Sequence, residues 1–192
     1  MQDVMLDLET MGTKPDAAIV AIGAVEFDTT TSQLGERFYL PVQLGSSVRL
    51  GGTMDPDTVL WWMQQDEAAR RELWQEDRAD LATALQRFAD WMAKRAPASE
   101  ARVWGNGAAF DNVVLRTAYE RHYLSPPWRF WNDRCYRTLK AQHPNVKMER
   151  TGAHHNAADD AESQARHLLA MLKQPNTQDQ RPRRKDSLCH EG

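Results

Sequence analysis

The chain begins with a short apolar stretch that ends in acid, residues 4–9. Because side chains alternate along a strand, Val4, Leu6 and Leu8 would share one face, and Asp7 and Glu9 would share the other. Ionised carboxylates packed in a sheet are costly without a cation or a shared proton. The stretch therefore has two interpretations: the edge of a metal site, or a half-buried strand whose acidic face is wet.

Length and charge exclude several classes of protein. The 192 residues suit one domain of ordinary size, and the formal net charge of −3 excludes a broadly basic nucleic-acid-binding surface but not a basic rim around an acidic site. The two cysteines, Cys135 and Cys189, form no disulfide framework. The cysteine usage fits a reducing cytoplasm, and we see no signal segment and no apolar run long enough to span a membrane, so we expect a cytoplasmic protein.

The hydrophobic pattern predicts a mixed α/β domain of three layers over residues 1–173, followed by a disordered polar and basic tail at 174–192. Short connections indicate that the first three strands of a five-stranded sheet are antiparallel. Gly23 marks a bulge or a close contact, and residues 45–53 are expected to form a loop. The predicted strands are 4–9, 18–28, 37–42, 103–105 and 128–133, and the predicted helices begin near Pro56, Asp66, Arg78, Asp111, Cys135 and His154.

Acidic residues recur where later elements begin. Asp111 starts the helix after the fourth strand, and Asp160 lies in the first turns of the last helix, just after His155. Hard oxygen ligands without thiolates suit two Mg²⁺ or Mn²⁺ ions, and a histidine can take a proton from water. Taken singly, Asp111 could be a helix cap, Asp160 could favour the helix dipole, and a lone histidine is more often structural.

As an ordered set, these residues resemble the DEDDh family of 3′-5′ exonucleases, which have the ribonuclease H-like fold. The matching motifs are Asp7-Leu8-Glu9-Thr10, the turn from Asn106 to Asp111, and His155 followed by Asp160. The resemblance implies that His155 is the general base and that Asp7, bridging both ions, binds metal with Glu9, Asp111 and Asp160. His154 and Asp159 keep the same spacing one step earlier, but His155 and Asp160 align better.

Further segments are similar to a small stand-alone bacterial and phage branch of that family, associated with exoribonuclease activity and near the exonuclease VIII type. They are Val59-Leu60-Trp61-Trp62 and residues 104–112 and 127–135. The resemblance implies metal-dependent release of nucleoside 5′-monophosphates from single-stranded 3′ ends, with RNA favoured over DNA, and it implies homodimers. The alternatives are a single-strand DNA exonuclease of the proofreading or recombination type, and a catalytically silent nucleic-acid-binding subunit.

Aromatic residues provide candidates for base stacking. Adjacent residues on a helix point about 100° apart, so we expect one of Trp61 and Trp62 to pack and the other to line the cleft. The alternative is that both pack or form dimer contacts. The remaining candidate substrate contacts are Phe110 for stacking, Met11 against the terminal base, Asn106 and Arg134 for phosphate or sugar, and Thr10.

Overall fold

The computed structural model describes residues 2–71, 73–74, 77–152 and 155–174. They form an α/β fold around a five-stranded mixed sheet in the order β3-β2-β1-β4-β5. Strands β1, β2 and β3 are antiparallel, as predicted, whereas β4 runs parallel to β1 and β5 runs parallel to β4. The bounds are Asp3–Thr10, Ile19–Asp28, Gln33–Pro41, Arg102–Gly105 and Asp133–Cys135 for β1 to β5.

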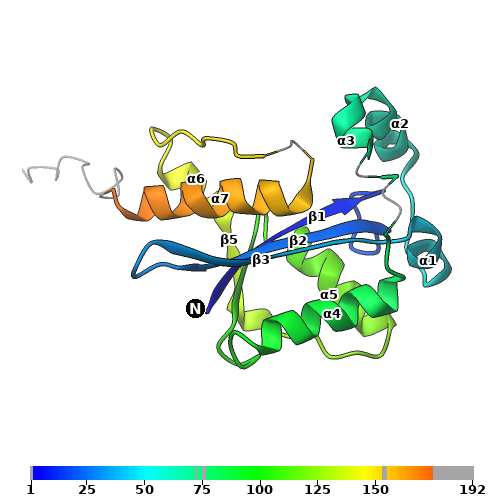
Figure 1. Ribbon diagram of the computed structural model, residues 1–192, viewed down its shortest axis with the longest axis horizontal. Coiled ribbons are helices and arrows are strands. Elements are labelled where there is room, and N and C mark those ends of the chain that lie inside the picture. Colours follow the sequence, from blue (N-terminus) through cyan, green and yellow to red (C-terminus); the bar gives the residue numbers. More distant parts are fainter. Residues whose placement is uncertain (1, 72, 75–76, 153–154, 175–192) are drawn as a thin grey trace, which may run out of the picture.

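Helices cover both faces of the sheet and give the three predicted layers (Figure 1). On one face lie α4 (Leu81–Ala93) and α5 (Asp111–Arg121), and on the other α6 (Tyr136–Gln142) and α7 (Ala157–Leu172). Three short helices lie near the carboxyl end of β1: α1 (Leu44–Arg49), α2 (Pro56–Gln64) and α3 (Glu67–Arg71). No helix in the described ranges is long and apolar enough to cross a membrane.

The alternation predicted for the first strand is present. Val4, Leu6 and Leu8 pack into the buried cluster that includes residues of α4 and α5. Met5 packs on the opposite face, against residues of α7. This alternation directs the side chain of Asp7 to the α7 face, where Gln164 of α7 donates a hydrogen bond of 2.8 Å to it.

Gly23 is a point of close contact, as predicted. It lies opposite Asp7 in the pairing of β2 with β1. A Cβ atom at this position would lie 2.1 Å from the carbonyl carbon of Ala157, the first residue of α7. The missing side chain therefore allows the start of α7 to lie directly on β2, beside Asp7.

Side-chain caps set the starts of several helices. Asp55 accepts a hydrogen bond from the backbone N–H of Asp57 at the start of α2, as expected from its position before Pro56. Asp80 caps α4 in the same way, so that helix begins three residues later than predicted. Asn156 caps α7 by accepting from the N–H groups of Ala158 and Asp159, which fixes where α7 begins.

The loop predicted at residues 45–53 is wrong in its first part, because α1 covers Leu44–Arg49. The segment has no apolar periodicity that would predict a helix, and contacts distant in sequence hold it. Ser47 Oγ accepts a hydrogen bond from the N–H of Ile19 at 2.8 Å. Ser46 Oγ accepts one from the N–H of Leu81 at 3.0 Å.

The fifth strand predicted at 128–133 is also misplaced, because β5 covers Asp133–Cys135. Trp128 is buried outside the sheet, where its ring packs edge-on against Tyr119 of α5 and its indole N–H donates to Asp133 at 2.8 Å. A 3₁₀ turn, η1 (Phe130–Asn132), then leads into β5. A run of aromatic residues has the composition of a strand, but here it packs against a helix. The predicted tail lies outside the described residues beyond Gln174.

Candidate active site

A cavity of about 330 Å³ opens where β1 and β4 end and α5 and α7 begin. Acidic residues from three separate parts of the chain line it, together with basic residues of α6 and of the segment between α6 and α7. The lining residues that matter below are Asp7, Glu9, Asn106, Phe110, Asp111, Arg137, Lys140, Arg150, His155, Asp160 and Gln164.

Asp7 and Glu9 are held by the central strand of the sheet. The backbone of β1 pairs with β2 along its whole length and with β4 up to Leu6. Glu9 is buried, and Asp7 is half-buried beneath α7. Their backbone positions are therefore set by the sheet ladder.

The side chain of Asp111 binds the backbone of β1 just beyond the point where the pairing of β1 with β4 ends. Its carboxylate accepts hydrogen bonds of 3.2 Å from the N–H of Leu8 and 3.2 Å from the N–H of Asn106. Phe110 occupies the N-cap position of α5 and makes no side-chain cap. The carboxylate of Asp111 is therefore directed to β1 and the cavity, and the simple capping role considered above does not describe it.

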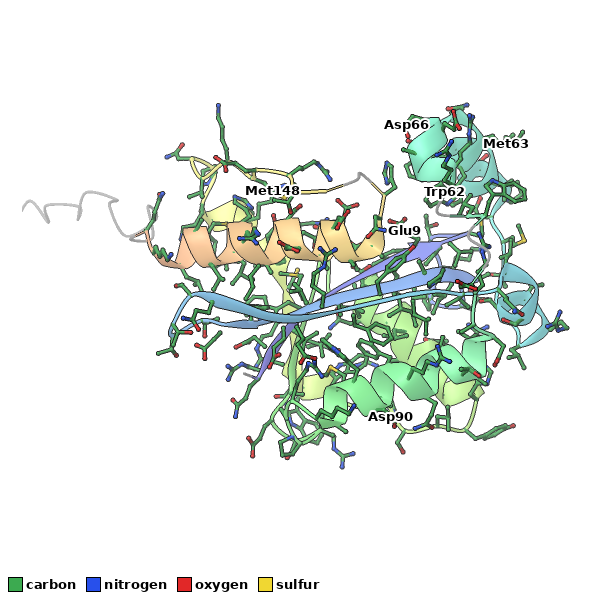
Figure 2. All side chains as sticks on the ribbon, viewed as in Figure 1. Glu9, Trp62, Met63, Asp66, Asp90 and Met148 are labelled. Atoms are coloured by element: carbon green, nitrogen blue, oxygen red, sulfur yellow. The ribbon has the colours of Figure 1, made fainter. Side chains whose placement is uncertain are left out.

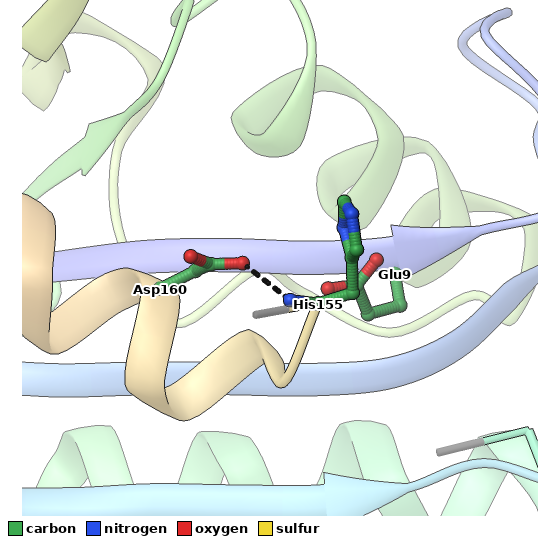
Figure 3. A group of neighbouring side chains, drawn as sticks. All are labelled: Glu9, His155 and Asp160. Carbon is green, nitrogen blue, oxygen red and sulfur yellow. Dashed lines mark hydrogen bonds between the residues drawn. The ribbon is translucent and has the colours of Figure 1, made fainter. Parts of the chain in front are cut away.

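Asp160 and His155 enter from the start of α7 (Figure 3). Asp160 accepts a hydrogen bond of 3.1 Å from the backbone N–H of His155 and forms an ion pair of 2.6 Å with Arg150. One ligand atom each from Glu9, His155 and Asp160 lie within 4.8 Å of one another. The neighbouring Asp159 instead pairs with Arg37 on β3, so the structure brings Asp160 to the cavity. His154 lies outside the described residues.

His155 has an unusual backbone and aromatic neighbours. Its φ of 64° lies in the left-handed region, which non-glycine residues rarely adopt. Its ring makes edge-to-face contacts with Trp61 and Trp62, at centroid distances of 5.0 and 5.8 Å. Figure 2 shows Trp62 at the base of α2, above the part of β1 that carries Glu9. Helix α2 therefore forms one wall around the imidazole.

Two of the carboxyl groups, Asp7 and Asp111, have raised pKa values. Burial, followed by the charges of Asp111 and Asp160, raises the pKa of Asp7 well above its usual range, although Gln164 and Arg150 oppose the shift. Burial raises the pKa of Asp111 to about 7 against the effect of its backbone hydrogen bonds. A divalent cation would relieve both the burial cost and the mutual repulsion, so this set of oxygen ligands fits Mg²⁺ or Mn²⁺.

A second cavity of about 540 Å³ adjoins the first and shares Leu8, Glu9 and Phe110 with it. Thr10, Trp61 and Trp62 also line it. Trp62 is 3% exposed and donates its indole N–H to the carbonyl of Thr10 at 3.0 Å, whereas Trp61 is 42% exposed. Trp62 is therefore the packed member of the pair, and Trp61 is the open one.

The other candidate substrate contacts are distributed unevenly. Asn106 lines the first cavity. Met11 is buried beneath α2 in a cluster with Trp62, and its contact with substrate stays a prediction. Arg134 donates to the backbone carbonyls of Trp131 and Asp133 at the start of β5, and so holds the local chain.

Several lining residues were not predicted from the sequence. Gln164 lies one helical turn after Asp160 on the same face of α7, a spacing that would have pointed to it. Its Oε1 atom is buried and has no hydrogen-bond partner in the described part of the chain. For Arg137, Lys140 and Arg150, the sequence offers no feature other than their positive charge from which a place in the site could have been predicted.

Comparison with known proteins gives the same fold. The nuclease domain of 3′hExo, a DEDDh family member bound to rAMP, superposes with a TM-score of 0.59 at 17% identity, covering 89% of this chain and 91% of that one. E. coli exonuclease I in complex with a dT13 oligonucleotide gives a TM-score of 0.56 at 18% identity, covering 89% of this chain and 40% of that one.

Two comparisons of sequence extend this likeness. An exodeoxyribonuclease of enterobacteria phage T4 is 26% identical over 161 residues, which cover 72% of this chain and 70% of the phage protein. The family model of the 3′-5′ exoribonuclease Rv2179c-like domain matches residues 2–172, most of the chain. The chain therefore belongs to the family of the 3′-5′ exoribonuclease Rv2179c-like domain, and it shares its fold with a nuclease of the DEDDh family.

Proposed function

We propose that this protein is an exoribonuclease that releases nucleoside 5′-monophosphates from the 3′ ends of single-stranded RNA, using two divalent cations. The observation that carries the proposal is the convergence of Asp7, Glu9, Asp111, His155 and Asp160 on one cavity. RNA is favoured because the family model is described by an exoribonuclease and a structural relative binds rAMP.

In the proposed site, the four carboxylates would hold the cations, with Asp7 shared between them. Bound there, the cations would polarise the phosphodiester and lower the pKa of a bound water. Gln164 donates to Asp7 and so keeps one of its oxygens oriented. The first turn of α7 lies on Gly23, which keeps Asp160 close to β1.

The imidazole of His155 is the proposed general base and accepts the proton of the attacking water at a ring nitrogen. Its backbone is held by Asp160, and its ring is held by Trp61 and Trp62. The base of the terminal nucleotide would stack in the adjoining cavity on Trp61 and Phe110, where base–aromatic contacts tolerate any sequence. Thr10 and Asn106 would contact the sugar or phosphate of the terminal nucleotide. Homodimer formation and a cytoplasmic location stay part of this proposal.

The test is degradation of RNA and DNA strands of matched sequence, with free and 3′-blocked ends, in the presence of Mg²⁺ or Mn²⁺. We expect 5′-monophosphates from the free RNA end and none from the blocked strands. If neither RNA nor DNA is shortened, the proposed activity is wrong. A calorimetric titration with Mn²⁺ would then distinguish a silent binding subunit, for which we expect no binding at millimolar concentration.

A single-strand DNA exonuclease is the second candidate, because a similar phage protein is named an exodeoxyribonuclease. The ribose 2′-hydroxyl distinguishes the two substrates. Faster release from DNA than from the matched RNA would favour this second candidate. The carboxylate and histidine assignments would be unchanged.

A further inference from the structure

Three basic residues, Arg137, Lys140 and Arg150, line one end of the candidate active site. Residues 134–150 contain five lysines and arginines and one glutamate, in a chain whose formal net charge is −3. Arg137 and Lys140 lie three residues apart on α6, so they point to the same side of that helix. Both side chains are exposed, and both line the cavity that holds the carboxylates.

The same two residues also line a further cavity of about 590 Å³ beyond the first. Asn106 is shared as well, and the carbonyl of Asn106 accepts a hydrogen bond of 2.7 Å from Arg137. The remaining residues that line this further cavity belong to the end of α6 and the segment that follows. Three adjoining cavities thus run from aromatic residues at α2, through the carboxylates, to basic residues on α6.

The chemistry of a 3′ end indicates which part of a strand this basic end suits. The phosphate of the terminal nucleotide is the one that is cleaved, so it must lie at the carboxylates. Every further phosphate of the substrate lies on the 5′ side of that bond. Basic side chains that lie next to the carboxylates, but not among them, are therefore in position to bind the phosphates of the uncleaved part of the strand.

We propose that Arg137 and Lys140 on α6 form a binding site for the backbone phosphates of the strand 5′ to the cleaved bond. This inference rests on the proposed function and adds to it the path of the strand. Because the site binds phosphates, it does not distinguish RNA from DNA. Strand length, rather than sequence, determines how much of the site is used.

The first experiment measures binding without cleavage. A 5′-fluorescein 12-mer, as RNA and as DNA, is titrated with the Asp7→Asn protein and with the same protein carrying Arg137→Ala or Lys140→Ala, and anisotropy is recorded at several salt concentrations. We expect each added substitution to weaken binding about three- to tenfold and to lower the salt slope by about 0.7, the value for one contact to a single strand. Arg87→Ala and Lys94→Ala, exposed residues of α4 and its C-cap across the sheet, are the matched controls and leave both values unchanged.

The second experiment measures length dependence with active protein. For Arg137→Ala and Lys140→Ala, the loss of kcat/KM on a 12-mer is expected to exceed the loss on a dinucleotide, which has one phosphate, by about three- to tenfold. Equal losses on both substrates, an unchanged salt slope, or a loss confined to RNA would each overturn the proposal. The binding experiment needs no turnover, so it also distinguishes failure of this inference from failure of the proposed activity.

Discussion

The two halves of the candidate site are held in different ways. Asp7 and Glu9 project from β1, whose backbone is paired within the sheet, and Asp111 accepts from that strand directly. His155 and Asp160 come from the start of α7, where His155 has a left-handed backbone and its ring rests on two tryptophans of α2. The strand half is placed by the fold itself, whereas the helix half depends on a few side-chain contacts, so substitutions should affect the two halves differently.

The largest effect is expected in the strand half. Asp7→Asn should lower kcat by about 10³-fold or more, because it removes the carboxylate shared by both proposed cations. The same substitution should raise the melting temperature of metal-free protein, because it removes a buried charge repelled by its neighbours. Asp159→Asn, on α7 but paired with Arg37, is the control and should retain activity. Substantial turnover by Asp7→Asn would show that Asp7 is not the shared ligand.

In the helix half, His155→Ala should lower kcat by about 10²- to 10³-fold, a range typical of a lost general base. Metal binding, measured by Mn²⁺ titration, should largely survive, because the four carboxylates remain. A loss of Mn²⁺ affinity as large as that of Asp7→Asn would instead make His155 a ligand. The comparison between the halves would then fail.

The tryptophans of α2 provide a finer test, because one is buried and the other is open. Trp61→Ala should lower kcat/KM about tenfold, from lost stacking and a less constrained His155, with little change in stability. Trp61→Phe keeps an aromatic ring and should recover most of the loss. Trp62→Ala should instead destabilise the fold by about 3–5 kcal/mol, measured by urea unfolding. The reverse pattern would exchange the two roles.

The smallest effect is a pH dependence of stability. The pKa values of Asp7 and Asp111 are raised in the folded state, so the folded protein keeps protons that the unfolded chain releases. Metal-free stability should therefore fall as the pH rises from about 4 through about 7. Mg²⁺ at roughly ten times its dissociation constant should raise the melting temperature by about 3 °C at pH 8 and by less at pH 5.5. A shift that is larger at pH 5.5 would contradict the assignment.

Prediction from the sequence succeeded where one local rule decided the outcome. Alternation along β1 placed Asp7 and Glu9 on one face, and the Asp55–Pro56 pair marked the start of α2. Prediction from the sequence failed where contacts between residues distant in sequence decided the structure. Helix α1 is held by hydrogen bonds to Ile19 and Leu81, and Trp128 packs on α5 rather than in the sheet. Which of Trp61 and Trp62 is buried likewise depends on how α2 lies on β1.

The absence of a side chain at Gly23 determines the depth of the site. A single methyl group there would overlap the backbone of Ala157 and lift the amino-terminal end of α7 away from the sheet. Asp160 and His155 would move outward with it, while Asp7 and Glu9 would stay on their strand. Gly23 thus sets the separation between α7 and β1. A substitution at this residue, which itself offers no ligand atom, would widen the gap across which the proposed cations must be shared.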